Sequence, residues 1–163
     1  MKQSKILLLT LIGLLLSVNN VQAKDKKESY NFTRALEEVQ KGNKQGAIEY
    51  FNKEVAENPH NGYAYMAIAA FHMDNSEYSD ARTAAESALK YLPKKDKNSL
   101  SHVYLLRSGL LTIECDTTAA YSDLATAIRL NPSNEDAYEN VDNSIMSKVG
   151  MMRVIQIIRK FFN

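Results

Sequence analysis

Histidine and cysteine are the residue types of this chain that could bind a metal or act as a nucleophile, and they are few. His60, His72 and His102 lie far apart, and Cys115 is the single cysteine. A metal site built on one helix or loop needs a spacing such as His-x-x-x-His or Cys-x-x-Cys, and neither occurs. The six glycines are scattered singly, so no glycine-rich phosphate loop is present. The sequence therefore predicts that the chain is not an enzyme and holds no metal or cofactor.

The side chains that remain as chemical candidates have structural explanations. We expect His60, in the turn after a proline, to be solvated, and His72 to be a core histidine with one hydrogen bond. Cys115 has no cationic neighbour in sequence that would activate its thiol, so we expect a small buried apolar residue. Glu37-Glu38 and Lys94-Lys95 are typical of solvated helix faces rather than of an acid–base pair.

The N-terminal segment, residues 1–23, has the layout of a secretory signal peptide. Lys2 and Lys5 precede an uncharged, mainly apolar run over residues 6–16, and small and polar residues then lead to Ala23. The run is shorter than the ~20 apolar residues that a membrane-spanning helix needs. We therefore expect cleavage after Ala23, export to the periplasm or the extracellular space, and a short charged leader over residues 24–27.

The charge and length of the chain limit the classes of function. The formal net charge is +1 for the complete chain and −1 once Lys2 and Lys5 are removed with the leader. A nearly neutral chain has no electrostatic basis for binding nucleic acid. The length suits one domain with its own hydrophobic core. Because a single cysteine cannot form an internal disulfide, packing alone must stabilise the fold.

An eight-residue phrase, N-P-x-N-x-x-A-Y, occurs twice, starting at Asn58 and at Asn131. The three prolines of the chain, Pro59, Pro93 and Pro132, recur at two similar intervals, of which the second is slightly longer. Each proline follows one apolar-periodic stretch and precedes another, so each marks the end of one helix and the start of the next. An insertion over residues 94–98 explains the longer second interval.

Small and aromatic residues repeat in phase with the prolines. An alanine stands twelve residues before each proline, and another stands five before the last two, where Glu54 breaks the pattern in the first unit. Small residues let crossing helices approach closely, and aromatic residues fill the space between units. The residues of this repeated pattern are Ala47, Phe51, Pro59, Tyr65, Ala69, Ala81, Ala88, Pro93, Tyr104, Ala120, Ala127, Pro132 and Tyr138.

The pattern predicts pairs of helices. We expect them over residues 28–41 and 44–57, 61–74 and 78–91, and 99–114 and 117–130. A further helix should begin near Asn134, whose side chain can cap it.

These residues resemble the tetratricopeptide repeat, a two-helix unit with small and aromatic residues at fixed positions and a closing proline. The unit over about residues 61–94 matches best; the units over 28–60 and 99–133 match less completely, with Asn31 standing where the first unit should have an aromatic residue. The resemblance implies an all-α helix-turn-helix solenoid, a right-handed superhelix of about three units. Residues 134–163 would then form a degenerate fourth unit or capping helices.

The resemblance also implies a concave groove, lined by the first helix of each unit, that binds a peptide or protein segment. In the second unit this helix reads YAYMAIAAFHM and is apolar on more than one face. Two interpretations remain open: these residues pack against the neighbouring unit, or they form an apolar groove. The predicted partner-binding residues are Tyr63, Met66, Ala70 and Met73, with His102, Leu105 and Ile113 continuing the surface in the third unit.

The first unit departs from this arrangement. Phe32, Leu36 and Val39 form an apolar stripe one residue out of phase with the motif. We assign this stripe to the core and leave it out of the predicted groove.

The C-terminal stretch MMRVIQIIRKFFN is apolar where a solenoid usually ends in a polar cap. Its stripe, formed by Val154, Ile155, Ile158, Phe161 and Phe162, has three interpretations. It packs on the third unit, it dimerises or touches a membrane, or the chain is a shortened form of a longer repeat protein.

The sequence taken together predicts an exported, non-catalytic interaction module, a scaffold or adaptor that binds a peptide or protein segment in its groove. The alternative is a structural envelope protein that self-associates through the apolar C-terminal helix. Membrane contact is expected only through that same helix.

Overall fold

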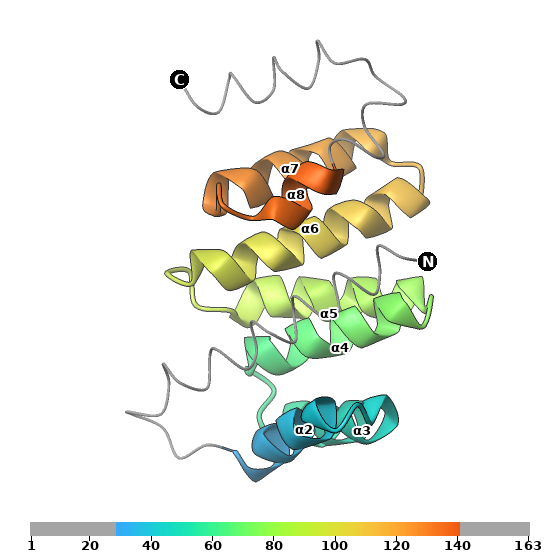
Figure 1. The fold of residues 1–163 in the computed structure, drawn as a ribbon, viewed down its shortest axis with the longest axis vertical. Helices are drawn as coiled ribbons and strands as arrows, with labels where there is room; N and C mark the ends of the chain where they lie inside the picture. Colours follow the sequence, from blue (N-terminus) through green and yellow to red (C-terminus); the bar gives the residue numbers. More distant parts are fainter. Residues whose placement is uncertain (1–28, 141–163) are drawn as a thin grey trace. The chain divides into compact units, whose positions relative to one another are not determined.

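The computed structural model describes residues 29–140, and all regular structure in this range is helical (Figure 1). The predicted signal peptide, the charged leader and the C-terminal apolar stripe lie outside the described residues. Among the described helices, none combines the length and the apolar composition needed to cross a membrane. The helices are α2 (Tyr30–Gln40), α3 (Lys44–Glu57), α4 (Gly62–Asp74), α5 (Tyr78–Tyr91), α6 (Lys97–Ile113), α7 (Thr117–Leu130) and α8 (Glu135–Asn140).

The helices pack as consecutive pairs, as the sequence predicts. The main helix–helix contacts join α2 to α3, α4 to α5 and α6 to α7, and α3 also packs on α4 (Figure 1). The chain divides into two compact units, one ending at Pro93 and the other starting at Lys94. The first unit therefore contains two helix pairs, and the second contains one pair and α8.

The turns inside the three pairs have one geometry. Each turn has three residues, and its middle residue, Gly42, Ser76 or Cys115, has a left-handed backbone with φ of 74°, 63° and 64°. In each turn the amide of this residue donates to the carbonyl three residues earlier, and the next amide donates to the carbonyl five residues earlier. This pair of bonds is the Schellman motif, which satisfies the last carbonyls of a helix.

The same turns confirm the register of the repeat. Gly42, Ser76 and Cys115 each precede one of the three prolines by the same number of positions. The second helix of each pair starts two residues after the left-handed residue and is 14 residues long. The predicted insertion over 94–98 is not a loop throughout: Asp96 caps Ser99, and α6 already begins at Lys97.

Small residues lie where the helices of a pair cross. Ala35 and Ala47 in the first pair, and Ala69 and Ala81 in the second, have no exposed surface. In the third pair the hydroxyl of Ser108 donates to the carbonyl oxygen of Ala120 at 2.8 Å. A side chain of one helix can reach the backbone of the other only where the two axes approach closely, as the predicted role of the small residues requires.

Phenylalanine rings lie in the core of the first compact unit, the one that ends at Pro93. Phe51 has no exposed surface, and its ring centroid lies 5.7 Å from that of Phe32 and 6.2 Å from that of Phe71. Phe32, Leu36 and Val39 are all buried, so the assignment of this stripe to the core is confirmed.

The repeated N-P-x-N phrase joins one pair to the next element through its asparagines. Asn61 accepts hydrogen bonds from the amides of Tyr63 and Ala64 and so caps α4. The helix predicted to begin near Asn134 is α8, which begins at Glu135. The Asn134 side chain is buried and donates to Ser101 Oγ at 3.0 Å, while its backbone carbonyl accepts from Ala137.

Candidate functional site

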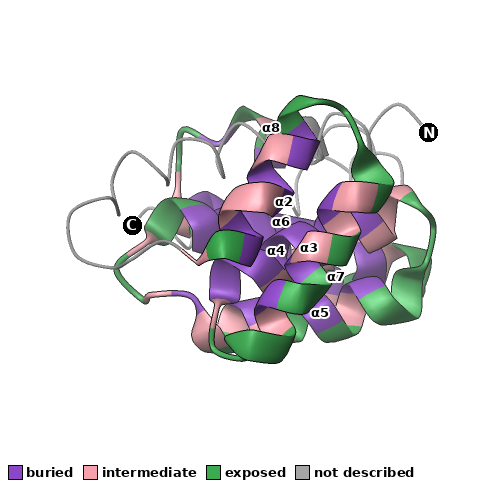
Figure 2. Ribbon diagram, turned by 90° about the horizontal axis from the view of Figure 1, so that it is seen from below, coloured by how far each residue is buried: buried purple, intermediate pink, exposed green. Residues whose placement is uncertain are grey.

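The predicted partner-binding residues of α4 are mostly part of the core. Tyr63 is 9% exposed, Met66 has no exposed surface, and Ala70 is also buried; only Met73 is partly exposed. Buried residues occupy much of α4, whereas the turns between helices are mainly exposed (Figure 2). Met66 stands ten residues before the left-handed residue of its turn, where the first pair has Phe32, which packs on Phe51. The packing interpretation is therefore favoured for Tyr63, Met66 and Ala70.

The predicted residues of α6 divide in the same way. His102 and Leu105 are buried, and His102 Nδ1 lies 2.9 Å from the carbonyl oxygen of Asn98 in its own helix. Ile113 is 46% exposed. Counted from the turn, however, Ile113 is equivalent to Asp74 rather than to Met73, so its inclusion by phase was wrong.

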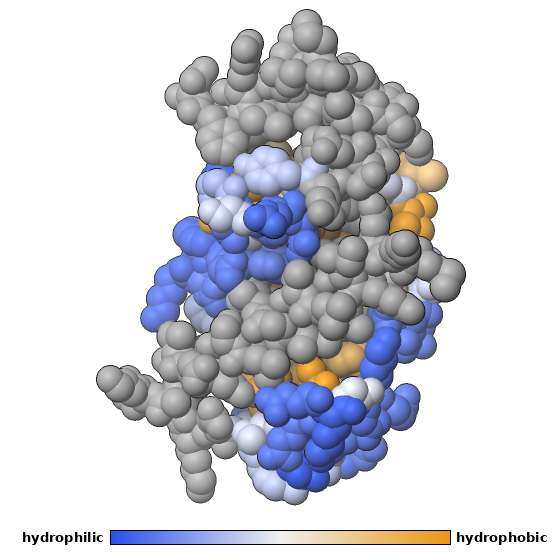
Figure 3. Space-filling view, viewed as in Figure 1, coloured by the Kyte–Doolittle hydropathy of each residue, from blue (hydrophilic) through white to orange (hydrophobic). Residues whose placement is uncertain are grey.

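Hydrophobic surface is limited in the space-filling view. Most visible atoms of the described residues are hydrophilic, and hydrophobic groups show at the end of α6, next to the turn into α7, and at α4, next to the α2 and α3 pair (Figure 3). Ile113 ends α6, and Cys115 follows in this turn and is also exposed. Our expectation that Cys115 is buried is wrong because the residue occupies the left-handed position of an exposed turn.

The repeated tyrosines are at least partly exposed, whereas Phe51 of the same pattern lies in the core. The rings of Tyr65 and Tyr91 are stacked with centroids 5.8 Å apart, and the ring of His60 meets Tyr91 edge-on at 4.9 Å. His60 is exposed, as predicted, but this contact makes it part of a cluster. Tyr138 is exposed and Tyr104 partly so. The alanines of the pattern are all buried.

His72 has the single hydrogen bond that we expected but is not in the core. Its side chain is partly exposed, and its Nδ1 lies 2.6 Å from Glu77 Oε2 across the turn. The hydrogen bond from His72 lowers the pKa of the Glu77 carboxyl below its ordinary value. The described residues contain no group of three or more His, Cys, Asp or Glu side chains that could hold a metal ion.

The expectation that Glu38 lies on a solvated helix face is wrong. Its carboxylate is buried rather than solvated, and it accepts hydrogen bonds from Lys41 Nζ at 2.7 Å and Asn43 Nδ2 at 2.6 Å. These two bonds lower the pKa of the Glu38 carboxyl. Lys41 and Asn43 belong to the first turn and Glu38 to the helix before it, so these bonds stabilise the turn.

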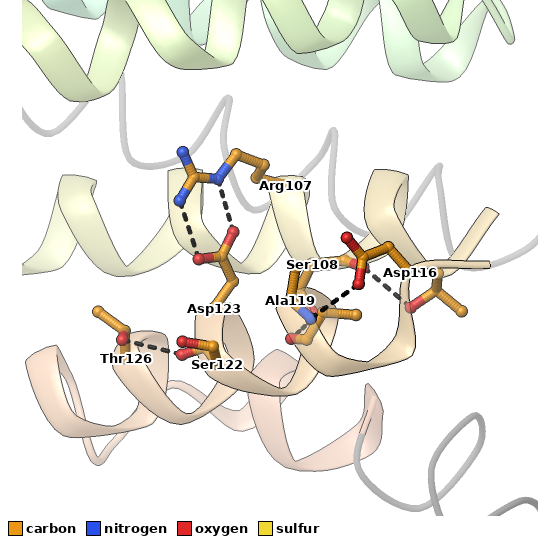
Figure 4. A network of polar contacts seen from close by, with 9 residues as sticks. Arg107, Ser108, Asp116, Ala119, Ser122, Asp123 and Thr126 are labelled. Atoms are coloured by element: carbon orange, nitrogen blue, oxygen red, sulfur yellow. Dashed lines mark hydrogen bonds and ion pairs between the residues drawn. The ribbon is translucent and has the colours of Figure 1, made fainter. Parts of the chain in front are cut away.

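An ion pair joins the helices of the third pair (Figure 4). Arg107 of α6 donates from Nε and Nη2 to the two carboxylate oxygens of Asp123 in α7, at 2.6 and 2.9 Å. The two residues stand eight before and eight after Cys115. The equivalent residues of the first pair are Arg34 and Tyr50, where the guanidinium lies 5.6 Å from the ring centroid. A polar cross-link thus recurs at one register position with different chemistry.

Glu54 is the residue that sequence reasoning underrated most. Glu54 breaks the alanine pattern of the sequence, yet it is 1% exposed and lies in a cluster of polar groups. Two asparagines of the repeated phrase, Asn58 and Asn61, follow it closely in sequence. A glutamate in the place of a core alanine, next to several amide donors, is a sequence signal for such a cluster.

No protein-family model matches this sequence, and a search of curated proteins found no significant match. The repeat register and the geometry described above are therefore the basis for any proposal about function.

Proposed function

We propose that this chain is an exported, non-catalytic interaction module whose tetratricopeptide-like repeats stack as a right-handed solenoid and bind a peptide or protein segment. The observation that carries the proposal is the threefold recurrence of one helix pair in one register. All three pairs have a left-handed residue at the same turn position, a second helix of 14 residues and a buried alanine twelve residues before the proline. Repeated helix pairs of this kind build extended surfaces, and such surfaces serve binding.

The burial of Tyr63 and Met66 narrows the surface on which a partner can bind. A side chain without exposed surface contributes to binding only indirectly, through the shape of the helix that carries it. Among the seven predicted residues, Met73 and Ile113 are those that are not buried: Met73 is partly exposed and Ile113 is 46% exposed. Methionine adapts to varied ligands, and an exposed isoleucine is a natural apolar anchor. We therefore place the binding contribution at Met73 and Ile113, each within its own compact unit.

Peptide selection tests this proposal directly. A displayed library of random peptides would be selected on the protein expressed from its complete sequence, and the affinities of the selected peptides would be measured by calorimetry. We expect Met73→Ala or Ile113→Ala to weaken binding by about tenfold, the effect of truncating one apolar anchor. Glu86→Ala and Arg129→Ala are matched controls, since both residues are exposed on second helices.

Two outcomes would reject the proposed surface. One is a selection that yields no binding peptide. The other is a set of peptides that bind both apolar variants as tightly as the controls. Circular dichroism of each variant would show that the helices are intact.

Export is the second part of the proposal and has its own test. It rests on the basic start, the apolar run and the small residues before Ala23. The mass of the protein recovered from the cell should correspond to a chain that begins at Lys24. A protein recovered from the cytoplasm with the segment from Met1 to Ala23 intact would contradict this part of the proposal.

A further inference from the structure

The carboxylate of Glu54 lies in the interior of the first unit and is surrounded by neutral donors. It accepts hydrogen bonds from the hydroxyl of Ser29, from Asn58 Nδ2 at 3.2 Å and from Asn61 Nδ2 at 2.8 Å. Among the described residues, no lysine, arginine or histidine is paired with it. Burial of a carboxylate is unfavourable unless hydrogen bonds replace its water, and here three donors do so.

The other two repeats show that the fold does not need a carboxylate at this position. The equivalent residues, five before the proline, are Ala88 and Ala127, and both are fully buried. In the third pair the equivalent asparagines use neutral acceptors: Asn131 donates to Asn98 Oδ1 at 2.7 Å, and Asn134 donates to Ser101 Oγ. The charge at Glu54 is therefore a special feature of the first repeat.

The three donors come from three different elements. Ser29 immediately precedes α2, Asn58 immediately follows α3, and Asn61 caps α4. Of the helices described, α2 has its extensive contacts with α3 alone. The carboxylate thus ties the start of α2 to the joint between α3 and α4.

We propose that the hydrogen bonds of Glu54 with Ser29, Asn58 and Asn61 hold α2 in its packed position on α3. We call this set of hydrogen bonds the latch. When the latch is lost, α2 opens as a unit while the pair of α4 and α5 stays folded. Opening exposes Phe51, which has no exposed surface while α2 is in place. The latch is a conformational device in the first repeat, independent of where a partner binds.

Two substitutions separate the hydrogen bonds from the charge. Glu54→Ala removes the acceptor of the Ser29 hydroxyl and of Asn61 Nδ2, and leaves Asn58 Nδ2 with its 3.5 Å contact to Ser29 Oγ. Glu54→Gln removes the charge but can keep all three bonds, because its Oε1 can accept from both asparagines and its Nε2 can donate to the Ser29 hydroxyl. Ser29→Ala removes the link to α2, which consists of the hydroxyl's bond to Glu54 and the bond that the hydroxyl accepts from Asn58 Nδ2 at 3.5 Å. Ser87→Ala is the matched control, because that hydroxyl donates to the carbonyl of Thr83 in its own helix.

Hydrogen–deuterium exchange of the complete chain, resolved by peptide, tests the latch. We expect Glu54→Ala and Ser29→Ala each to speed the exchange of α2 by about tenfold, the factor that corresponds to the loss of about one hydrogen bond. The double variant should exchange no faster than Glu54→Ala, since both changes break one link. Exchange in α5, α6 and α7 should stay within threefold of the wild type, and Glu54→Gln should resemble the wild type.

Unchanged exchange of α2 in Ser29→Ala would overturn the proposal. A uniform increase in exchange rate across α2 to α5 would also overturn it, because it would mean an ordinary loss of stability. So would a double variant whose increase in exchange is the product of the two single increases. If Glu54→Ala does not fold, Ser29→Ala and Glu54→Gln still decide the matter, because both leave Asn58 Nδ2 and Asn61 Nδ2 with an acceptor at position 54.

Discussion

The three left-handed turn positions allow the backbone geometry to be tested by substitutions with opposite expected signs. The first turn has a glycine, Gly42, at its left-handed position, whereas the other two turns have Ser76 and Cys115 there, which carry side chains. We expect Ser76→Gly and Cys115→Gly to raise the free energy of unfolding and Gly42→Ala to lower it. The control is Ser79→Gly in the first turn of α5, where the same substitution in a right-handed helix should be destabilising.

The expected magnitude follows from the backbone alone. An L-residue in the left-handed conformation costs roughly 1–2 kcal/mol, and the greater freedom of glycine in the unfolded chain offsets ~0.5–1 kcal/mol of that gain. The net stabilisation at Ser76 or Cys115 should therefore be about 0.5–1 kcal/mol. A Cβ built on Gly42 meets no atom within 4 Å, so Gly42→Ala introduces no clash. Its expected cost of about 1 kcal/mol is purely conformational.

Urea unfolding followed by circular dichroism measures these differences. With a denaturant slope of about 2 kcal/mol/M, the midpoint should rise by roughly 0.2–0.5 M for the two glycine variants. If the two compact units unfold separately, Ser76→Gly should shift the transition of the first unit and Cys115→Gly that of the second. Destabilisation by both glycine variants to the extent seen for Ser79→Gly would refute the reasoning.

Three further predictions concern the interhelical contacts. Asp123→Ala should destabilise the second unit by about 1–3 kcal/mol, because it leaves Arg107 without its two-bond partner; a double-mutant cycle in urea gives the coupling energy, and additivity would contradict it. Phe51→Ala should cost about 3–5 kcal/mol by leaving a cavity between two buried rings, measured by the same unfolding assay, with a loss below ~1 kcal/mol against the prediction. The lowered pKa of Glu77 means that its bond to His72 adds stability above the ordinary glutamate pKa and that this contribution disappears as the pH falls through the lowered value. The stability difference between wild type and Glu77→Gln should therefore shrink in acid, as unfolding curves across that pH range would show.

Most of the helix pattern could be read from the sequence because its signals are local. Apolar residues at helical spacing, prolines between helices and capping residues all act within a few positions. The predicted helices over 44–57, 78–91 and 117–130 match α3, α5 and α7 to the residue. The predicted start of α6 is two residues late because Asp96, inside the predicted insertion, caps the helix.

The burial of the predicted groove was harder to foresee. Apolar residues at Tyr63, Met66 and Ala70 show that one face of α4 avoids water, but the pattern is the same whether a helix or a ligand covers that face. The prediction that Cys115 is buried is wrong for a different reason. Its exposure depends on its place in a turn, and no glycine marks that turn, as Gly42 does in the first pair.

Residue types at fixed short spacings are enough to locate most of the helices, to pair them and to show that the unit repeats. Only the tertiary structure decided which polar groups meet. Ser29 and Glu54 are 25 residues apart, and Arg107 and Asp123 are 16 apart, so their contacts exist only after the helices have packed. The partner of a buried charge is set by the crossing of helices in space, and a residue's type and spacing alone do not reveal it.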